Sequence, residues 1–137
     1  MSNRAQGDIG EASAIAWLAQ QGAFIFTPLF RSPDYDLVAE IDGRVLRIEV
    51  KTTVRKTPVG HWQPMLCTKG GNQSWNGVSK RFDPNRCDYV FFHVGDGRRW
   101  FIPSVRIEAA TAIVLGGTKY AEFEIEPGPP LPVRTLS

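Results

Sequence analysis

Cysteine is scarce in this sequence: Cys67 and Cys87 are the two present among 137 residues, and neither belongs to a Cys-x-x-Cys pair or a cysteine–histidine pattern. The sequence therefore offers no disulfide framework and no zinc motif, and it suits a reducing compartment. Long apolar runs are also missing, since none approaches the roughly 18 residues of a membrane-spanning helix, and the N-terminus lacks a signal peptide's apolar core. From these absences we expect a soluble, cytoplasmic protein that does not bind membranes.

The composition is that of one ordinary globular domain. Apolar residues make up 42% of the chain and charged residues 22%, which excludes disorder for most of it, and no internal repeat is evident. We expect a single domain over residues 1–126. Residues 127–137 contain four prolines, and we expect them to form a disordered tail.

The net charge of +2 conceals an uneven distribution. Residues 44–86 contain nine basic and two acidic side chains, whereas acidic residues outnumber basic ones in the remainder. Such a block can be simply a solvated face, but it also suits a polyanionic ligand, for which nucleic acid is the natural candidate.

Residues 36–51 have the pattern of a β-hairpin. Aliphatic residues alternate on both sides of Asp42-Gly43, a pair typical of a two-residue type I′ turn. With that turn, paired residues have numbers that sum to 85, so that Asp36 lies across from Glu49. Alternation places these two acids and Lys51 on one face and covers the other face with apolar residues, namely Leu37, Ala39, Ile41, Leu46, Ile48 and Val50.

The repulsion between two opposed carboxylates has to be offset by a positive charge. At a separation of roughly 5 Å, two like charges repel by about 3 kcal/mol at an effective dielectric constant of about 20. Lys51 can supply part of the compensation, and the trio is then an exposed salt-bridge cluster. Alternatively, converging carboxylates with room for water are ligands for Mg²⁺. We interpret the hairpin as half of a metal site.

A helix is predicted over residues 6–21, with Gly22 as its stop. Glu11, Ile15 and Leu18 recur at helical spacing, so Glu11 lies on the stripe that faces the core. This acid either has a functional partner or is a first-turn acid favoured by the helix dipole.

The remaining pattern predicts mostly strands. We expect strands over residues 23–29, 61–67, 87–94 and 98–103, a short helix over 104–110, and a hairpin formed by 112–115 and 120–125. Residues 68–82 are polar and rich in glycine, which is typical either of a loop that contacts DNA or of a merely mobile loop. Our candidate DNA contacts are Arg31, Arg55, Lys56, Lys69, Asn72, Gln73, Trp75, Lys80 and Arg81.

Three segments together resemble a known superfamily. They are Gly7-Asp8-Ile9-Gly10-Glu11, then Tyr35-Asp36-Leu37-Val38, then Ile48-Glu49-Val50-Lys51-Thr52. Their order and spacing resemble the PD-(D/E)XK nucleases, especially the group I intron-associated homing endonucleases and the Holliday-junction-resolvase-like nucleases. The resemblance covers roughly residues 4–126.

The resemblance implies an α/β fold with a restriction-endonuclease-like mixed central β-sheet flanked by helices. It also implies that Glu11, Asp36 and Glu49 bind Mg²⁺, with Mn²⁺ as a possible substitute, and that Lys51 assists the attacking water. The chain departs from the superfamily's motif at one point. Its Pro-Asp pair is Pro33-Asp34, whereas the predicted hairpin register places Asp36 across from Glu49. If Asp34 were the ligand instead, the predicted pairing would be wrong.

Three functions are consistent with this pattern. The first is a Mg²⁺-dependent DNA endonuclease of homing or site-specific type that acts as a homodimer or homotetramer, because cutting both strands needs two sites. The second is a Holliday junction resolvase, which differs in acting on branched instead of linear double-stranded DNA. The third is a DNA-binding or assembly module that keeps the fold without activity, although such a module has no reason to keep opposed acids.

Overall fold

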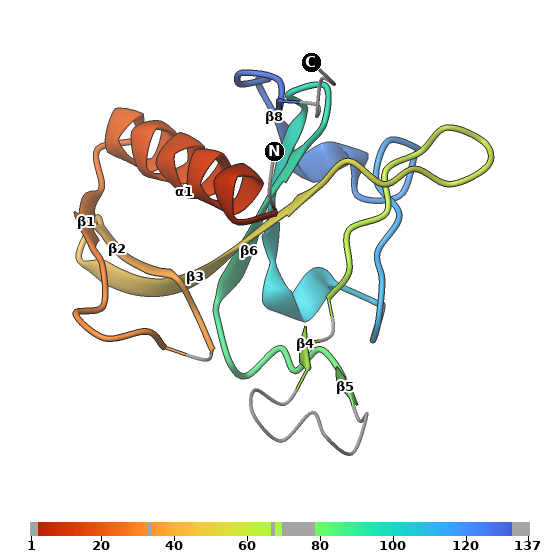
Figure 1. The fold of residues 1–137 in the computed structure, drawn as a ribbon. Helices are drawn as coiled ribbons and strands as arrows, with labels where there is room; N and C mark the ends of the chain where they lie inside the picture. Colours follow the sequence, from red (N-terminus) through yellow and green to blue (C-terminus); the bar gives the residue numbers. More distant parts are fainter. Residues whose placement is uncertain (1–2, 33, 67, 70–78, 133–137) are drawn as a thin grey trace.

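The computed structural model describes residues 3–32, 34–66, 68–69 and 79–132. One α-helix, α1 (Asn3–Gln20), packs on a six-stranded mixed sheet of order β1-β2-β3-β6-β7-β8 (Figure 1). The strands of this sheet are β1 (Phe24–Phe26), β2 (Leu37–Ile41), β3 (Arg44–Thr53), β6 (Tyr89–Val94), β7 (Arg99–Pro103) and β8 (Glu124–Ile125). A separate two-stranded hairpin consists of β4 (Thr68–Lys69) and β5 (Ser79–Lys80). The predicted α/β class with a mixed central sheet is confirmed.

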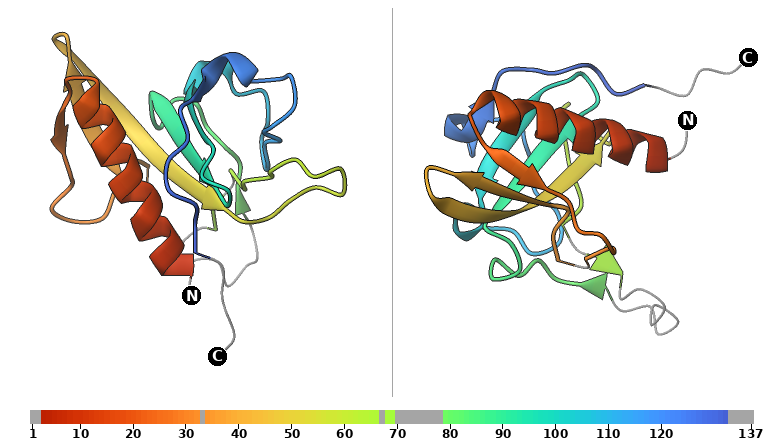
Figure 2. Two further views of the ribbon diagram at one scale, coloured as in Figure 1. Left: turned by 90° about the horizontal axis from the view of Figure 1, so that it is seen from above. Right: turned by 90° about the vertical axis from the view of Figure 1, so that its left-hand side faces the viewer.

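The two faces of the sheet are covered differently. Helix α1 lies along one face, and irregular segments cover part of the other, so in the described residues the predicted flanking helices amount to one α-helix (Figure 2). The irregular cover includes two short 3-10 turns, η2 (Ser104–Arg106) and η3 (Ala121–Phe123).

Helix α1 begins three residues before the predicted start and ends one residue before the predicted end. Gly22 has φ +89°, a conformation that glycine adopts without strain and that stops the helix. The helix buries Ala14 and Leu18 against the sheet, where they form one core cluster with Leu37, Ala39, Leu46, Ile48 and Phe91.

The central hairpin forms as predicted. Asp42 and Gly43 both have positive φ, 52° and 75°, as a type I′ turn requires. The pairs of β2 with β3 run from Ile41 with Arg44 to Leu37 with Ile48, so the expected register is confirmed. On its other side, β3 pairs with β6 in parallel, and this makes the sheet mixed.

A second core cluster lies on the opposite face, over β6 and β7. There Val90, Phe92 and Trp100 from the strands pack with side chains from the irregular segments, including Trp62 and Leu115. This half of the sheet is therefore buried on both faces.

Several predicted elements differ from the structure. Residues 61–67 and 112–115 form no named strand in the described part of the chain; instead, Trp62 and Leu115 exchange two backbone hydrogen bonds of 2.8 Å in an isolated bridge. Their side chains are buried, and a second isolated bridge joins Met65 and Ala112. The strand predicted over 23–29 is limited to β1, and the hairpin predicted from 120 is replaced by η3 and β8.

The short helix predicted over residues 104–110 is a three-residue 3-10 turn. Pro103 occupies its N-cap position without a side-chain hydrogen bond. Ser104, the expected cap, is buried, and its hydroxyl lies 3.4 Å from the thiol of Cys87.

The chain after Glu126 packs on the domain, in contrast to the expected disordered tail. The N–H of Gly128 donates to the carbonyl of Gly97, and that of Leu131 donates to the carbonyl of Gly95. Leu131 is 3% exposed. The domain therefore continues through residue 132, and residues 133–137 lie outside the described residues.

Candidate active site

Glu49 and Lys51 project from β3 on the face opposite α1. Their side chains are 17% and 19% exposed, and Lys51 Nζ lies 3.0 Å from Glu49 Oε1. Both residues have β6 beside them, since Glu49 pairs with Val90 and Lys51 with Phe92. Because β3 is an interior strand, these two charged groups have little freedom to move.

Asp36 lies immediately before β2 and is fixed by two hydrogen bonds to β3. Its backbone N–H donates to the carbonyl of Ile48 at 2.9 Å, and its carboxylate Oδ2 accepts from the N–H of Val50 at 2.7 Å. The regular ladder therefore ends at Leu37, and the Asp36 side chain takes the place of the next backbone partner. The result is a fixed acid whose negative charge acts on Glu49.

The pKa of Glu49 is raised. Burial is the main cause, and the negative charge of Asp36 adds to it, whereas the charge and hydrogen bond of Lys51 and the charge of Arg86 act in the opposite direction. The like charge of Asp36 thus disfavours ionisation of Glu49. A bound cation would remove this penalty.

Glu11 approaches the same carboxylates from α1. A Cβ atom added to the preceding Gly10 would overlap the methyl group of Thr52, so the glycine allows the helix to lie directly on β3. The pKa of Glu11 is raised by burial, by the charge of Asp36 and by that of Asp8, and the charge of Arg31 opposes this shift. Asp36 is therefore electrostatically coupled to both glutamates.

The donor set fits a hard divalent cation in part. In the described ranges, no group of three histidine, cysteine or acidic side chains is close enough to hold a metal ion together. The coupled pair of Asp36 and Glu49 remains, and Mg²⁺ is commonly bound by one or two carboxylates while it keeps several waters. These two residues fit such an ion; Glu11 is near them but does not complete a three-carboxylate cluster.

Asp34 lies outside the paired residues of β2 and β3. It lies in a bend before β2, and its carboxylate Oδ1 is 3.8 Å from Nε of Arg86. Asp34 therefore forms an ion pair with Arg86. The sequence did not predict Arg86 near these acids, because it showed only that Arg86 is one of the basic residues in 44–86.

A small hollow adjoins Glu49. It is lined by Asp34, Glu49, Leu66, Arg81, Phe82, Asp83 and Arg86. Arg81 and Arg86 thus bring positive charge to the carboxylates, a combination that suits an anionic group.

The predicted DNA contacts that the structure describes come from several separate segments of the chain. Arg31, Arg55, Lys56 and Arg81 are exposed, and the ammonium of Lys56 lies 4.6 Å from the ring centroid of Trp62. Lys69 and Lys80 lie on the paired strands β4 and β5. The predictions for Asn72, Gln73 and Trp75 lie outside the described residues.

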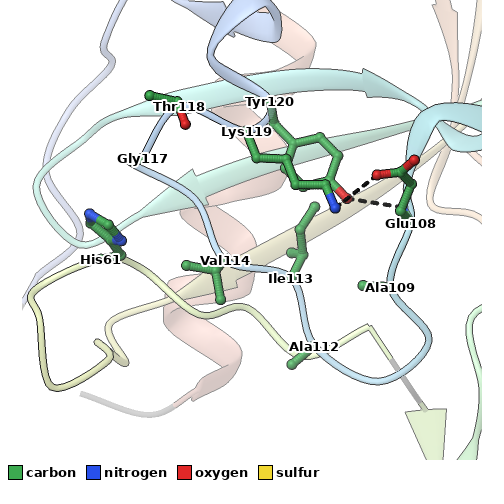
Figure 3. A pocket seen from close by; sticks show the side chains of 10 residues that line it. All are labelled: His61, Glu108, Ala109, Ala112, Ile113, Val114, Gly117, Thr118, Lys119 and Tyr120. Atoms are coloured by element: carbon green, nitrogen blue, oxygen red, sulfur yellow. Dashed lines mark hydrogen bonds and ion pairs between the residues drawn. The ribbon is translucent and has the colours of Figure 1, made fainter.

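A larger hollow of about 380 Å³ lies elsewhere (Figure 3). It is lined by His61 and residues from 108–120, and its two charged residues, Glu108 and Lys119, form an ion pair at 2.8 Å. None of Glu11, Asp36, Glu49 and Lys51 lines it. The volume of a hollow therefore does not identify the candidate site, which we assign from the positions of Asp36 and Glu49.

Solved structures provide comparisons for the fold. The bacterial homing endonuclease I-Ssp6803I matches with a TM-score of 0.73 and 23% identity over 88% of this chain and 82% of that one. Hjc of Archaeoglobus fulgidus, a Holliday junction resolvase from an archaeal hyperthermophile, matches with a TM-score of 0.54 and 17% identity over 88% of this chain and 91% of its own. At these identities the likeness concerns the fold.

None of the curated protein sequences compared with the chain matches it. No helix in the described ranges is long and apolar enough to cross a membrane. A family model for PD-(D/E)XK endonucleases matches residues 1–115. This match covers the helix with Glu11 and the hairpin with Asp36, Glu49 and Lys51, and the chain therefore belongs to the PD-(D/E)XK endonuclease family.

Proposed function

We propose that the protein is a Mg²⁺-dependent endodeoxyribonuclease of site-specific or homing type, in which Mn²⁺ can replace Mg²⁺. The observation that carries this proposal is the position of Asp36. Its carboxylate is tied to the N–H of Val50, beside the ion pair of Glu49 and Lys51. A largely buried glutamate whose ionisation is opposed by a neighbouring acid reduces stability, and a binding role explains why this chain has it.

Asp36 and Glu49 would hold the ion directly. When bound, Mg²⁺ supplies Lewis-acid stabilisation of charge that develops on a phosphoryl oxygen. Glu11 would accept hydrogen bonds from water at the edge of the site. Its coupling to Asp36 supports this placement.

Lys51 would stabilise the transition state. Its ammonium lies 3.0 Å from Glu49, so a phosphate that reaches the carboxylates also reaches this cation. A fixed positive charge in a half-buried site favours the extra negative charge of the transition state, and it orients the attacking water by the same field.

The substrate would be DNA, bound along the basic surface that includes Arg31, Arg55, Lys56 and Arg81. A site-specific enzyme on linear duplex is our first candidate, and a resolvase of four-way junctions is the second. The fold resembles those of both I-Ssp6803I and Hjc, which supports both candidate substrates. A non-catalytic DNA-binding module is the alternative of a different class.

The test uses the purified full-length protein with linear duplex and four-way junction DNA, with and without Mg²⁺. We expect cleavage that requires Mg²⁺ and that is lost in Asp36→Asn and Glu49→Gln, while DNA binding is retained. Glu122→Gln, at an exposed acid in η3, is the matched control and should cleave normally. Mg²⁺-dependent cleavage that persists in both site variants would refute the assignment, and binding without cleavage by the wild type would favour the non-catalytic module.

A further inference from the structure

A hollow of about 380 Å³ lies where α1 begins and β3 ends, and we call it the α1–β3 hollow. Figure 2 shows the first turns of α1 beside this end of β3. The hollow is lined by Gln6 of α1, by Thr52 and Thr53 of β3, and by Val54 and Arg55, which follow the strand. Its volume is within the range of roughly 300–1,000 Å³ that is typical of ligand sites. None of the candidate metal ligands lines it, so it is distinct from the acidic site.

The α1–β3 hollow nevertheless adjoins the candidate active site. Side chains alternate along a strand, so Thr53 faces the same side as Lys51, and the two positions are roughly 7 Å apart along β3. Among the described strands, β3 has β6 as its only partner beyond Ile48, which leaves this end of the strand open on its other side. Successive nucleotides of B-form DNA rise about 3.4 Å. A DNA strand that follows β3 with one phosphate at Lys51 would therefore bring a nucleotide about two positions away to the hollow.

Gln6 is placed at the hollow by the packing of α1. It lies one helical turn before Gly10, on the same stripe of the helix, and Gly10 lies directly against Thr52. The Gln6 side chain is half-buried, and its carboxamide makes no hydrogen bond to another described residue. No described residue therefore competes with a ligand for its donor and its acceptor.

Thr53 and Arg55 are held in place by the backbone. Thr53 Oγ1 accepts a hydrogen bond of 3.0 Å from the N–H of Arg55, and the hydroxyl can still donate its own proton. The carbonyl of Arg55 accepts a hydrogen bond of 3.0 Å from the N–H of Gln63, which ties this segment to the chain that carries the buried Trp62. The hollow is therefore formed in the free protein and does not depend on a ligand to order it.

The chemistry of the lining favours a nucleobase over a simple anion. Arg55 is the one charged residue among the five, and the others supply a carboxamide, two hydroxyls and the side chain of Val54, which is 42% exposed. A base edge presents neighbouring donors and acceptors and, in thymine, a methyl group. Phosphates, by contrast, are bound mainly by charged side chains and carry no sequence information.

We propose that the α1–β3 hollow reads a base of the DNA close to the cleaved phosphate, with Gln6 and Thr53 as specificity-determining residues. A carboxamide matches the major-groove edge of adenine through two hydrogen bonds, so adenine is the base expected at Gln6. Arg55, exposed beside them, contacts the phosphate backbone and fixes the position of the strand. This inference rests on the proposed nuclease function, because it is cleavage that defines which base lies close to the cut.

Selection from a library of duplexes with randomised bases tests the inference on the full-length protein. One arm isolates bound duplexes in the presence of a chelator, and the other sequences the ends that are cut in Mg²⁺. Gln6→Ala should reduce the discrimination between the best and the worst base at one position, within about two nucleotides of the cut, at least about tenfold, the equivalent of about 1.4 kcal/mol. Thr53→Val should act in the same direction, and Thr53→Ser, which keeps the hydroxyl, should behave like the wild type.

Two further variants separate base recognition from general effects. Arg55→Ala should weaken binding to all sequences alike and lower the slope of log affinity against log salt by about one. Gln20→Ala, at an exposed glutamine at the other end of α1, is the matched control and should keep the wild-type base profile.

The two arms distinguish this inference from the nuclease assignment. If the wild type cleaves DNA but Gln6→Ala and Thr53→Val keep its base profile, the hollow does not read sequence and the nuclease assignment stands. A Gln6→Ala variant that loses affinity equally for every sequence would also overturn the inference, because that result indicates a structural or phosphate-binding role. If the wild type does not cleave, yet the bound duplexes show a base preference that Gln6→Ala removes, the nuclease assignment falls and base recognition by the hollow stands.

Discussion

At the scale of single residues, the site is made of charges that the fold does not fully compensate. Glu11 and Glu49 both have raised pKa values, because burial and the charge of Asp36 oppose their ionisation. A group whose pKa is raised in the folded state contributes stability below its unfolded pKa and loses it as the pH rises through the folded pKa. The metal-free protein should therefore be destabilised by these acids at neutral pH.

Glu11→Gln should raise the free energy of unfolding at neutral pH by about 0.5–2 kcal/mol in the metal-free protein. The gain should shrink as the pH falls toward 4.5, the ordinary pKa of a glutamate, because both side chains are then neutral. Urea unfolding between pH 4 and pH 8 in the presence of a chelator measures this. Glu122→Gln is the control, and a pH-independent gain would contradict the electrostatic explanation.

Lys51→Ala should lower the single-turnover cleavage rate by about 10²–10³-fold, because the cation that faces the developing charge is lost. Metal affinity should stay the same or increase, since one positive charge is removed beside Glu49. Calorimetric titration with Mg²⁺ and quenched-flow cleavage measure the two effects separately. A loss of metal affinity comparable with the loss of rate would argue against this role, and Lys119→Ala, at an exposed lysine, should change neither.

At the scale of elements, the contact of α1 with β3 positions Glu11. This contact depends on Gly10, because any side chain there meets the methyl group of Thr52. Gly7, one turn earlier, has no atom near its missing Cβ and provides a matched position.

Gly10→Ala should destabilise the protein by about 1–3 kcal/mol through overpacking, whereas Gly7→Ala should stabilise it by up to about 1 kcal/mol through helix propensity. Adding Thr52→Ser to Gly10→Ala removes the methyl group that clashes and should restore most of the loss. Thermal and urea unfolding of the three variants measure this. If Gly7→Ala proves as damaging as Gly10→Ala, the close approach is not the cause.

The hairpin could be predicted from the sequence because its determinants are local. Asp42-Gly43 sets the turn, and the turn sets the register that runs from Ile41 with Arg44 to Leu37 with Ile48, directly before Asp36. By contrast, the segments around Trp62 and Leu115 look like strands because they are apolar, yet only long-range packing decides that they meet in isolated bridges instead of a continuous ladder. The ion pair of Arg86 with Asp34 also depends on long-range folding, and no local sequence pattern predicts this pair.

At the scale of the whole molecule, the segment after Glu126 packs against the half of the sheet that contains β6 and β7. Leu131 is buried, and the carbonyl of Pro129 lies 2.7 Å from Nε2 of the buried His93. Proline content predicted disorder here, but proline disfavours helix and interior strand without preventing an extended segment from packing.

Leu131→Ala should lower the free energy of unfolding by about 2 kcal/mol or more, as is usual for a buried leucine. Val105→Ala, at an exposed position, should have little effect, and cleavage by the folded fraction should be unchanged in both variants. Urea unfolding provides the measurement. An unaffected stability in Leu131→Ala would show that the segment after Glu126 contributes nothing to the domain in solution.

Strand β3 changes neighbours at Ile48, where its pairing with β2 ends and its pairing with β6 begins. Beyond that point its former β2 side would be a bare edge inside the sheet, able to recruit a foreign strand. The Asp36 carboxylate accepts a hydrogen bond from the N–H of Val50 there, and so it protects this edge from pairing with another strand, in addition to its proposed role as a metal ligand. An inactive form intended for co-crystallisation should therefore replace Asp36 with asparagine, which keeps an oxygen acceptor, and not with alanine, which would leave that edge open.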